Sequence, residues 1–93
     1  MFFKKKIKIV FSKTVWKNNR EKRSLMVDDL IQQKILLNKT REEVLDILGF
    51  EFNDANSNIW TYYIAVKRFF FSSKKYLSVF FDKEGLVHKT TYK

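Results

Sequence analysis

The spacing of apolar side chains along the chain changes from a helical to a strand-like period. Between residues 19 and 34 they recur every three or four positions, as on one face of a helix. The stripe consists of Arg23 and four apolar residues, Met26, Val27, Leu30 and Ile31. Asn18 or Asn19 suits the N-cap, because its side chain can accept a hydrogen bond from an amide of the first turn. A first helix is therefore predicted over 19–34.

A second, shorter helix is predicted over 41–48, because suitable capping residues stand at both of its ends. Thr40 precedes Glu43 by three residues, the spacing of a capping box, in which each side chain accepts a hydrogen bond from the other residue's amide. Gly49 stands where a left-handed C-terminal cap is expected. The apolar positions of this helix are Val44, Leu45, Ile47 and Leu48.

Beyond residue 58 the period shortens to two, which is typical of strands. Three strands are predicted, over 59–66, 76–81 and 86–92. The first is rich in β-branched and aromatic residues, which favour strands. Residues 82–85 form a short hairpin connection, in which Gly85 supplies a positive φ. Residues 51–58 are polar and are predicted to form a loop.

Two further segments have weaker patterns. Residues 7–11 alternate between apolar and basic side chains, which predicts a short edge strand. Residues 67–75 leave two alternatives open. They extend the preceding strand through the run of phenylalanines into a turn at Ser72-Ser73, or they form a separate loop.

Together these elements predict an α+β fold, with two N-terminal helices packed on one face of a three-stranded antiparallel sheet. Residues 11–93 are predicted to form a single domain, preceded by a basic arm over 1–10. A hydrophobic content of 45%, with 17% aromatic residues, is ample for one core. The predicted core comprises Trp16, Met26, Leu30, Val44, Leu48, Trp60, Tyr62, Ile64, Leu77 and Val79.

Candidate catalytic chemistry is sparse. The sequence has no cysteine, which excludes disulfides, thiolate metal sites and a cysteine nucleophile. His88 is the single histidine, and in a strand it is interpreted as a packing or surface residue rather than a general base. The sequence has two pairs of adjacent acids on predicted helices, Asp28-Asp29 and Glu42-Glu43. Adjacent residues lie about 100° apart around a helix axis, so the two carboxylates of a pair are not expected to bind the same metal ion. We interpret Asp28 or Asp29 as the partner of a nearby cation, and expect no enzymatic activity, metal, cofactor or small-molecule substrate.

The net charge of +9 is concentrated at the N-terminus. Residues 1–23 carry nine basic side chains against Glu21 alone, a balance of +8, so the other seventy residues contribute only +1. The nine are Lys4, Lys5, Lys6, Lys8, Lys13, Lys17, Arg20, Lys22 and Arg23. Such a segment favours an anionic partner. Three kinds of partner fit: a nucleic acid, a lipid headgroup or an acidic protein. The alternative is a solvated leader that only aids solubility.

A second cluster, over 67–75, mixes basic and aromatic side chains. Such a mixture can lie at a membrane interface, contact a protein or stack nucleic-acid bases. The alternative is that one or two of its phenylalanines belong to the core or cover the sheet edge. The two clusters together give the candidate contacts for a partner or lipid: Phe2, Phe3, Lys4, Lys5, Lys6, Lys8, Lys67, Arg68, Phe69, Phe70, Phe71, Lys74 and Lys75.

Several of these segments resemble the SmpA/OmlA, or BamE-type, family of small lipoproteins, which is related to β-lactamase-inhibitor-like modules. The resemblance covers about residues 11–92. The matching segments are Trp16-Lys17, Arg23 to Leu30, Leu36 to Gly49, Trp60 to Tyr63 and Phe81 to Val87. These motifs build turns and caps and contain no reactive groups. The resemblance implies a non-enzymatic module of the bacterial cell envelope that offers its sheet face and adjoining loops to another protein.

The sequence departs from the family pattern at three points. Asn38 replaces a glycine, and since Asn tolerates a left-handed backbone we expect the turn to persist. Glu51 stands where a proline is expected, which predicts a looser loop. No cysteine is present for lipid attachment, so outer-membrane anchoring does not carry over.

An envelope protein is therefore the leading predicted partner. The first alternative is a peripheral binder of anionic membrane, held by the N-terminal lysines at about 1 kcal/mol each. Nucleic-acid binding ranks behind both, and an inhibitor or immunity role depends on the fold analogy alone. The run after Phe2 is too short for a signal peptide. We therefore expect an envelope or membrane-associated location on the family resemblance, with the cytoplasm as the alternative.

Overall fold

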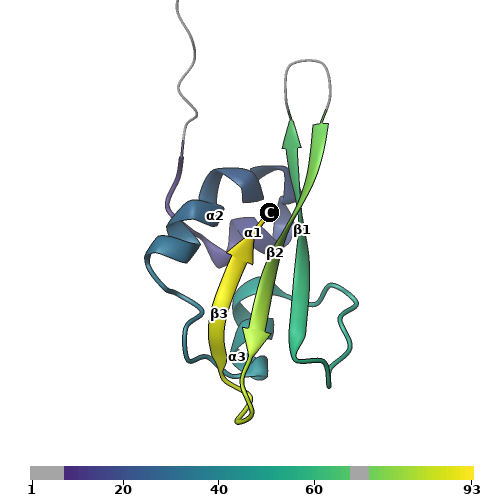
Figure 1. The fold of residues 1–93 in the computed structure, drawn as a ribbon. Coiled ribbons are helices and arrows are strands. Elements are labelled where there is room, and N and C mark those ends of the chain that lie inside the picture. Colours follow the sequence, from purple (N-terminus) through teal and green to yellow (C-terminus); the bar gives the residue numbers. More distant parts are fainter. Residues whose placement is uncertain (1–7, 68–71) are drawn as a thin grey trace, which may run out of the picture.

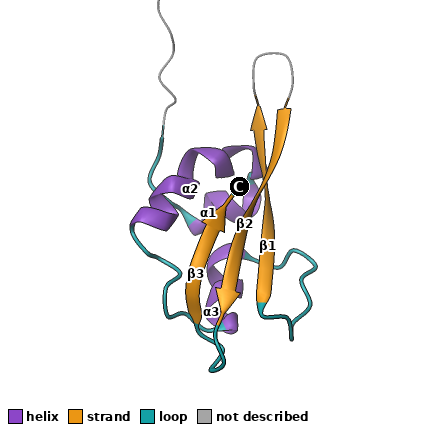
Figure 2. Cartoon of the chain, viewed as in Figure 1, coloured by secondary structure: helices purple, strands orange, loops and turns teal. Residues whose placement is uncertain are grey.

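The computed structural model describes residues 8–67 and 72–93. Its elements in order are α1 (Lys13–Asn18), the 3-10 turn η1 (Arg20–Lys22), α2 (Arg23–Gln32), α3 (Arg41–Leu48), β1 (Ile59–Lys67), β2 (Ser72–Phe81) and β3 (Val87–Tyr92). The strands form one antiparallel sheet in the order β1-β2-β3, and the helices lie against one of its faces (Figures 1 and 2). This confirms the predicted α+β class, with its helices N-terminal to the strands.

The helical region differs from the prediction at its start. A helix that was not predicted, α1, begins after Ser12, whose hydroxyl accepts a hydrogen bond from the amide of Val15. Asn19 is an N-cap as predicted, but it caps η1, where its side chain accepts from the Glu21 amide at 3.2 Å. The regular helix α2 begins only at Arg23. The predicted helix over 19–34 is therefore a 3-10 turn followed by a shorter α-helix.

Helix α3 forms as predicted. The Glu43 amide donates to the Thr40 hydroxyl at 3.2 Å, and the Thr40 amide donates to the Glu43 carboxylate at 2.9 Å, which completes the capping box. Gly49 ends the helix with φ 85° and ψ −177°, a conformation essentially restricted to glycine. The predicted cap thus has its positive φ, but its ψ is extended rather than left-handed. Asn38 has φ 65°, as the turn before this helix requires.

We expect Thr40→Ala to lower the free energy of unfolding by about 1 kcal/mol, because an amide of the first turn loses its acceptor. Urea denaturation followed by circular dichroism measures the change. Glu42→Gln is the control, because Glu42 lies in the same first turn outside the box. A Thr40→Ala protein as stable as the control would contradict the role of the cap.

The three strands are longer or shorter than predicted by a few residues. β2 begins at Ser72, and Ser72 and Ser73 pair with Lys67 and Val66, so these serines belong to the strand rather than to a turn. A strand was also predicted over 7–11. This prediction is wrong for residues 8–11, the part that the structure describes, because they form no strand. Ile9 instead donates its amide to the carbonyl of Leu25 at 3.0 Å, which attaches this segment to α2.

The core lies between the helices and the sheet. All ten predicted core residues are buried, so this prediction is confirmed. The core also contains Val27, Leu36, Phe81 and Val87. Phe81 packs edge-on against Trp60, with 5.0 Å between the ring centroids. Because alternate strand residues fill the core, the side chains between them must point to the opposite face of the sheet.

Candidate functional site

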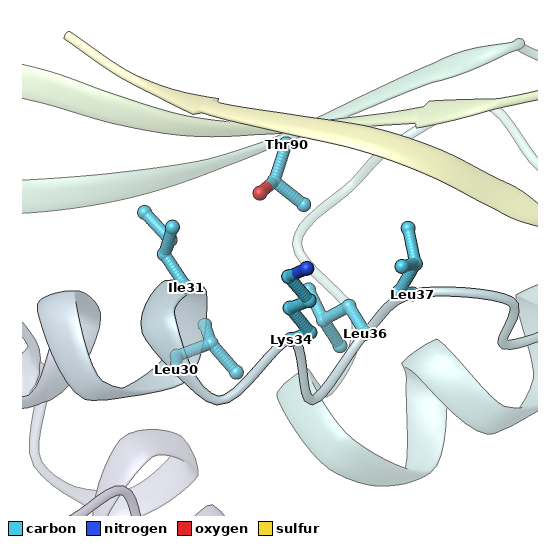
Figure 3. A pocket seen from close by; sticks show the side chains of 6 residues that line it. All are labelled: Leu30, Ile31, Lys34, Leu36, Leu37 and Thr90. Carbon is cyan, nitrogen blue, oxygen red and sulfur yellow. The ribbon is translucent and has the colours of Figure 1, made fainter.

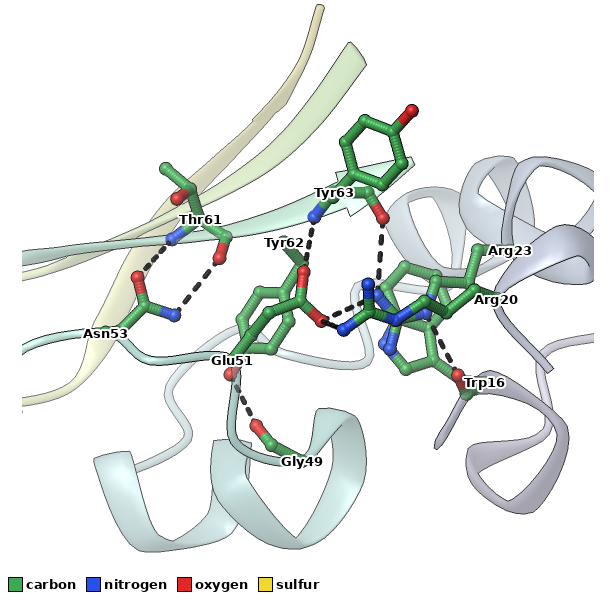
Figure 4. A network of polar contacts seen from close by, with 9 residues as sticks. All are labelled: Trp16, Arg20, Arg23, Gly49, Glu51, Asn53, Thr61, Tyr62 and Tyr63. Atoms are coloured by element: carbon green, nitrogen blue, oxygen red, sulfur yellow. Dashed lines mark hydrogen bonds and ion pairs between the residues drawn. The ribbon is translucent and has the colours of Figure 1, made fainter. Parts of the chain in front are cut away.

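In the described part of the chain, no helix covers the face of the sheet that points away from α1, α2 and α3. We call it the open face. Cross-strand pairing arranges its central part in three rows: Ile59, Phe80 and Lys89; Thr61, Ser78 and Thr91; and Tyr63, Tyr76 and Lys93. Tyr63 points away from the helices, whereas its neighbour Tyr62 points toward them (Figure 4). The open face is thus continuous across all three strands.

Aromatic side chains and cations dominate the open face. The rings of Tyr63 and Tyr76 meet edge to face, with 5.8 Å between centroids. The ammonium of Lys89 lies 4.7 Å from the centre of the Phe80 ring, a cation–π geometry. His88 packs against the same ring at 6.5 Å and is itself exposed. Within residues 8–67 and 72–93, the acidic residues lie outside these three rows, so the open face combines apolar area with positive charge.

One side of the sheet is bordered by the loop between α3 and β1, which a buried ion pair holds in place (Figure 4). The guanidinium of Arg23 is 2.8 Å from a carboxylate oxygen of Glu51 and donates to the Trp16 carbonyl at 2.9 Å. The other carboxylate oxygen of Glu51 accepts from the Tyr63 amide at 2.6 Å. The prediction that Glu51 loosens this loop is therefore wrong, because Glu51 fixes the loop to β1.

Two more side chains of the loop bind the backbone of β1. The Asn53 side chain accepts from the Thr61 amide and donates to the Thr61 carbonyl, both at 3.0 Å. The Ser57 hydroxyl accepts from the amide of Ile59 at 3.1 Å and donates to its carbonyl at 2.8 Å. These residues, with Glu51, bond the outward-facing backbone groups of β1 at three alternate positions.

The same loop presents two aromatic side chains to solvent. Phe50 is 66% exposed and Phe52 is 88% exposed, and their ring centroids are 5.3 Å apart. Phe52 has φ 58°, a left-handed backbone that costs a bulky residue about 1–2 kcal/mol. Beside the pair is an apolar pocket of about 80 Å³, lined by Leu45, Phe50, Glu51, Asn53, Ala55, Trp60 and Tyr62. Its volume suits one apolar side chain rather than a cofactor.

We expect Phe52→Gly to raise the free energy of unfolding by about 0.5–1 kcal/mol, because glycine adopts a positive φ without steric cost. Phe50→Gly is the control, since Phe50 is also exposed but its φ is not positive. Thermal and urea denaturation of both variants measure the difference. A Phe52→Gly protein less stable than the Phe50→Gly protein would show that the Phe52 ring, not its backbone, matters.

Burial of the Tyr62 hydroxyl, reinforced by the nearby Glu51 carboxylate, raises the pKa of Tyr62 well above its ordinary value. The hydroxyl donates to the Gly49 carbonyl at 2.9 Å. Tyr62 therefore stays neutral and joins β1 to the end of α3. Its role is structural.

The predicted contact residues do not form one surface. Lys8 binds Asp28 at 2.7 Å, which provides the cation partner expected for that pair of acids. Lys74 is exposed at the end of the open face, whereas Lys75 points to the helix side, 5.1 Å from the Tyr92 ring. The backbone of Lys67 belongs to β1. The other candidates lie outside the described residues: Phe2, Phe3, Lys4, Lys5, Lys6, Arg68, Phe69, Phe70 and Phe71.

The segregation of charge seen in the sequence is partly lost in the fold. Lys13 binds the Asp46 carboxylate at 2.9 Å, and Lys17 donates to the Asp46 carbonyl at 2.8 Å. The Lys13 ammonium holds the pKa of the Asp46 carboxyl below its usual value. With Arg23 buried against Glu51 as well, several cations of residues 8–23 already have partners within the chain. They are less available to an external anion than the sequence suggests.

The described residues also bear on metal binding and on membrane crossing. Among residues 8–67 and 72–93, no three His, Asp or Glu side chains are grouped so that they could hold a metal ion. In the same residues, each helix is too short or too polar to cross a bilayer. No protein-family model, curated protein or solved structure matches the chain.

Proposed function

We propose that this protein is a non-catalytic binding module of the bacterial cell envelope that holds another protein against its open face. The observation that carries the proposal is the composition of that face. Tyr63, Tyr76 and Phe80 provide aromatic anchors, and aromatic residues are enriched where proteins bind each other. Lys89 and Lys93 flank these anchors, so a partner with acidic residues around an apolar centre is favoured.

The cell-envelope part of the proposal is supported by the resemblance to BamE-type proteins. The resemblance implies N-terminal helices followed by three strands, with a capped helix directly before the strands and a closing hairpin, and this chain has α3 and the β2–β3 connection at those places. In this chain the sheet is held rigidly from behind by a packed core, and from the side by the loop that carries Glu51 and Asn53. A rigid, preformed surface reduces the entropy lost on binding.

Site-specific photo-crosslinking tests the proposal. A photoreactive phenylalanine analogue in place of Tyr76, which is 42% exposed, is expected to capture one protein in the envelope fraction of living cells. The same analogue in place of Val10 is the control, because Val10 is 78% exposed but lies outside the open face.

Charge reversal then tests the face itself. Lys89→Glu is expected to weaken the Tyr76 crosslink, whereas Lys83→Glu, on the turn after β2, is expected to leave it unchanged. Equal capture at both crosslinker positions, or an even distribution of the protein through the cytosol, would contradict the proposal. Crosslinks to nucleic acid or lipid would also overturn it.

A further inference from the structure

The two outer edges of the sheet differ in how their backbone groups are satisfied. On β1, the outward-facing groups of Ile59, Thr61 and Tyr63 are bonded by side chains of the adjoining loop and of Arg23. An exposed edge invites another strand to pair with it, and such a cover prevents this.

The hydrogen-bond pattern shows which groups of β3 face outward. Tyr76 and Lys93 exchange both backbone bonds, at 3.0 and 3.1 Å, so every second residue back from Lys93 faces β2. Thr90 and Tyr92 must therefore direct their N–H and C=O groups away from the sheet. Neither residue has a backbone hydrogen-bond partner for these groups within the described part of the chain.

Among residues 8–67 and 72–93, backbone partners for this edge occur only at its beginning. The Val87 amide donates to the Lys39 carbonyl at 2.9 Å, and the Val87 carbonyl accepts from the Asn38 amide at 2.8 Å. The segment before α3 thus already pairs with the beginning of β3 in the manner of a short strand. An extended chain that continued this line would reach the outward-facing groups of Thr90 and Tyr92.

An apolar pocket lies directly beside the edge at Thr90 (Figure 3). Thr90 forms one wall, and α2 with the segment after it forms the other, with Ile31, Lys34 and Leu37 turned toward Thr90. Leu37 is 39% exposed, so the pocket is open to solvent. Its volume of about 50 Å³ would take one small apolar side chain from a strand paired with β3.

The charge around the edge is positive. Lys34 lines the pocket, Lys89 lies on β3, and Lys93 directly follows β3. Burial, and after it the Asp28 carboxylate, raises the pKa of Tyr92. The Asp28 carboxylate is itself held by Lys8 at 2.7 Å. Two copies of this chain paired edge to edge would bring these lysines together, which disfavours self-association through β3.

We propose that the edge of β3 at Thr90 and Tyr92 binds an extended, acidic segment of a partner protein, which adds to the sheet as a fourth strand. Its backbone bonds the outward-facing groups of the two residues, and one small apolar side chain enters the pocket at Leu37. Its carboxylates face Lys34 on the helix side and Lys89 on the open face. This mode of recognition is strand addition. It goes beyond the proposed function, because the backbone edge of β3 is distinct from the open face. The two surfaces share Lys89 and Lys93, so Lys34 and Tyr76, which each belong to one surface alone, are used to test them separately.

The test uses synthetic peptides and the full chain. A fluorescein-labelled ten-residue peptide of aspartates with one central Val carries carboxylates on both faces of the added strand. By fluorescence anisotropy it is expected to bind at least about tenfold more tightly than its counterpart with lysines in place of the aspartates. Hydrogen exchange at the Thr90 and Tyr92 amides is expected to slow on binding. The acidic peptide with N-methyl groups on alternate residues is expected not to bind, because it cannot form the backbone ladder.

Substitutions identify the site. Lys34→Glu is expected to weaken binding of the acidic peptide by about tenfold, with Lys83→Glu as the unaffected control. Thr90→Pro removes the outward-facing amide and is expected to abolish binding. If that variant fails to fold, Lys34→Glu and the N-methylated peptide still decide the matter.

Several results would overturn the inference. These are equal binding of acidic and basic peptides, binding without protection at Thr90, and dimerisation of the chain through β3 in the absence of peptide. Tyr76→Ala is expected to leave peptide binding unchanged. The strand-addition site can thus fail while the open-face proposal stands, and the reverse is also true.

Discussion

Replacing Arg23 with Ala is expected to lower the free energy of unfolding by about 3–5 kcal/mol, a large part of the total for a domain of this size. Arg23 is only 3% exposed, and its guanidinium bonds the Trp16 carbonyl, the Tyr63 carbonyl and the Glu51 carboxylate. Without it, Glu51 keeps a largely buried negative charge with no buried partner. Urea denaturation at neutral pH, followed by circular dichroism, measures the loss.

The neighbouring Arg20 supplies a matched control. It approaches the same carboxylate oxygen at 3.7 Å, but its side chain is 60% exposed. We expect Arg20→Ala to cost no more than about 0.5 kcal/mol, as for other exposed ion pairs. The double variant Arg23→Met, Glu51→Gln is expected to be more stable than the sum of its single variants predicts, because it leaves no unpaired charge. Additive losses would show that the two side chains act independently.

Trp16→Ala is expected to cost about 3–5 kcal/mol, because the substitution leaves a cavity at the centre of the core. Trp16 is fully buried, and it packs against Phe11 and under the guanidinium of Arg23. It is also the one buried residue of α1, a helix of six residues that has little stability of its own. We therefore expect α1 to detach in this variant, which the loss of amide protection over residues 13–18 would report.

Two further variants test whether the loss of stability comes from the missing Trp16 ring. Thr14→Ala is the control, because Thr14 is exposed on the same short helix and the substitution leaves Trp16 in place. Trp16→Phe is expected to cost less than Trp16→Ala, since the ring volume is mostly kept and the indole N–H has no hydrogen-bond partner within the described residues. Equal losses for Trp16→Phe and Trp16→Ala would contradict the packing explanation.

The parts of the fold that depend on neighbouring residues could be predicted from the sequence. The cap formed by Thr40 and Glu43 lies within four positions, and the structure reproduces it bond for bond. The alternation along 59–66 fixed which side chains of β1 enter the core, because a strand has a period of two. The same alternation places the intervening side chains on the other face of the sheet. The candidate contacts were nevertheless predicted in the N-terminal arm and over 67–75, so Tyr63, Tyr76 and Phe80 were missed as site residues.

The parts that depend on distant residues could not be predicted. Arg23 belongs to the apolar stripe of its helix, but its partner Glu51 is 28 positions away, in a loop that looked merely polar. Asn53 and Ser57 also gave no indication of their role, because Asn and Ser are common in any loop. The helix α1 was missed since six residues with a single buried side chain give no detectable period.

The charge distribution shows the same limit. Net charge along the sequence places nearly all of the excess before residue 24, but folding brings Lys13 and Lys17 against Asp46, about thirty positions later. Charge counted along the sequence therefore overstates how many of these cations are available to an external anion. Conversely, Lys34 and Lys89 belong to the part of the chain with nearly balanced charge, yet within the described residues neither forms an ion pair.

The side chains that cover β1 also determine what happens when the fold begins to come apart. If the loop with Glu51 and Asn53 lifts away while the core holds, three alternate backbone positions of an otherwise intact strand become available together. Such a species can recruit further molecules and grow into fibrils. For variants that weaken this loop, light scattering should therefore rise at temperatures where circular dichroism still reports a folded chain.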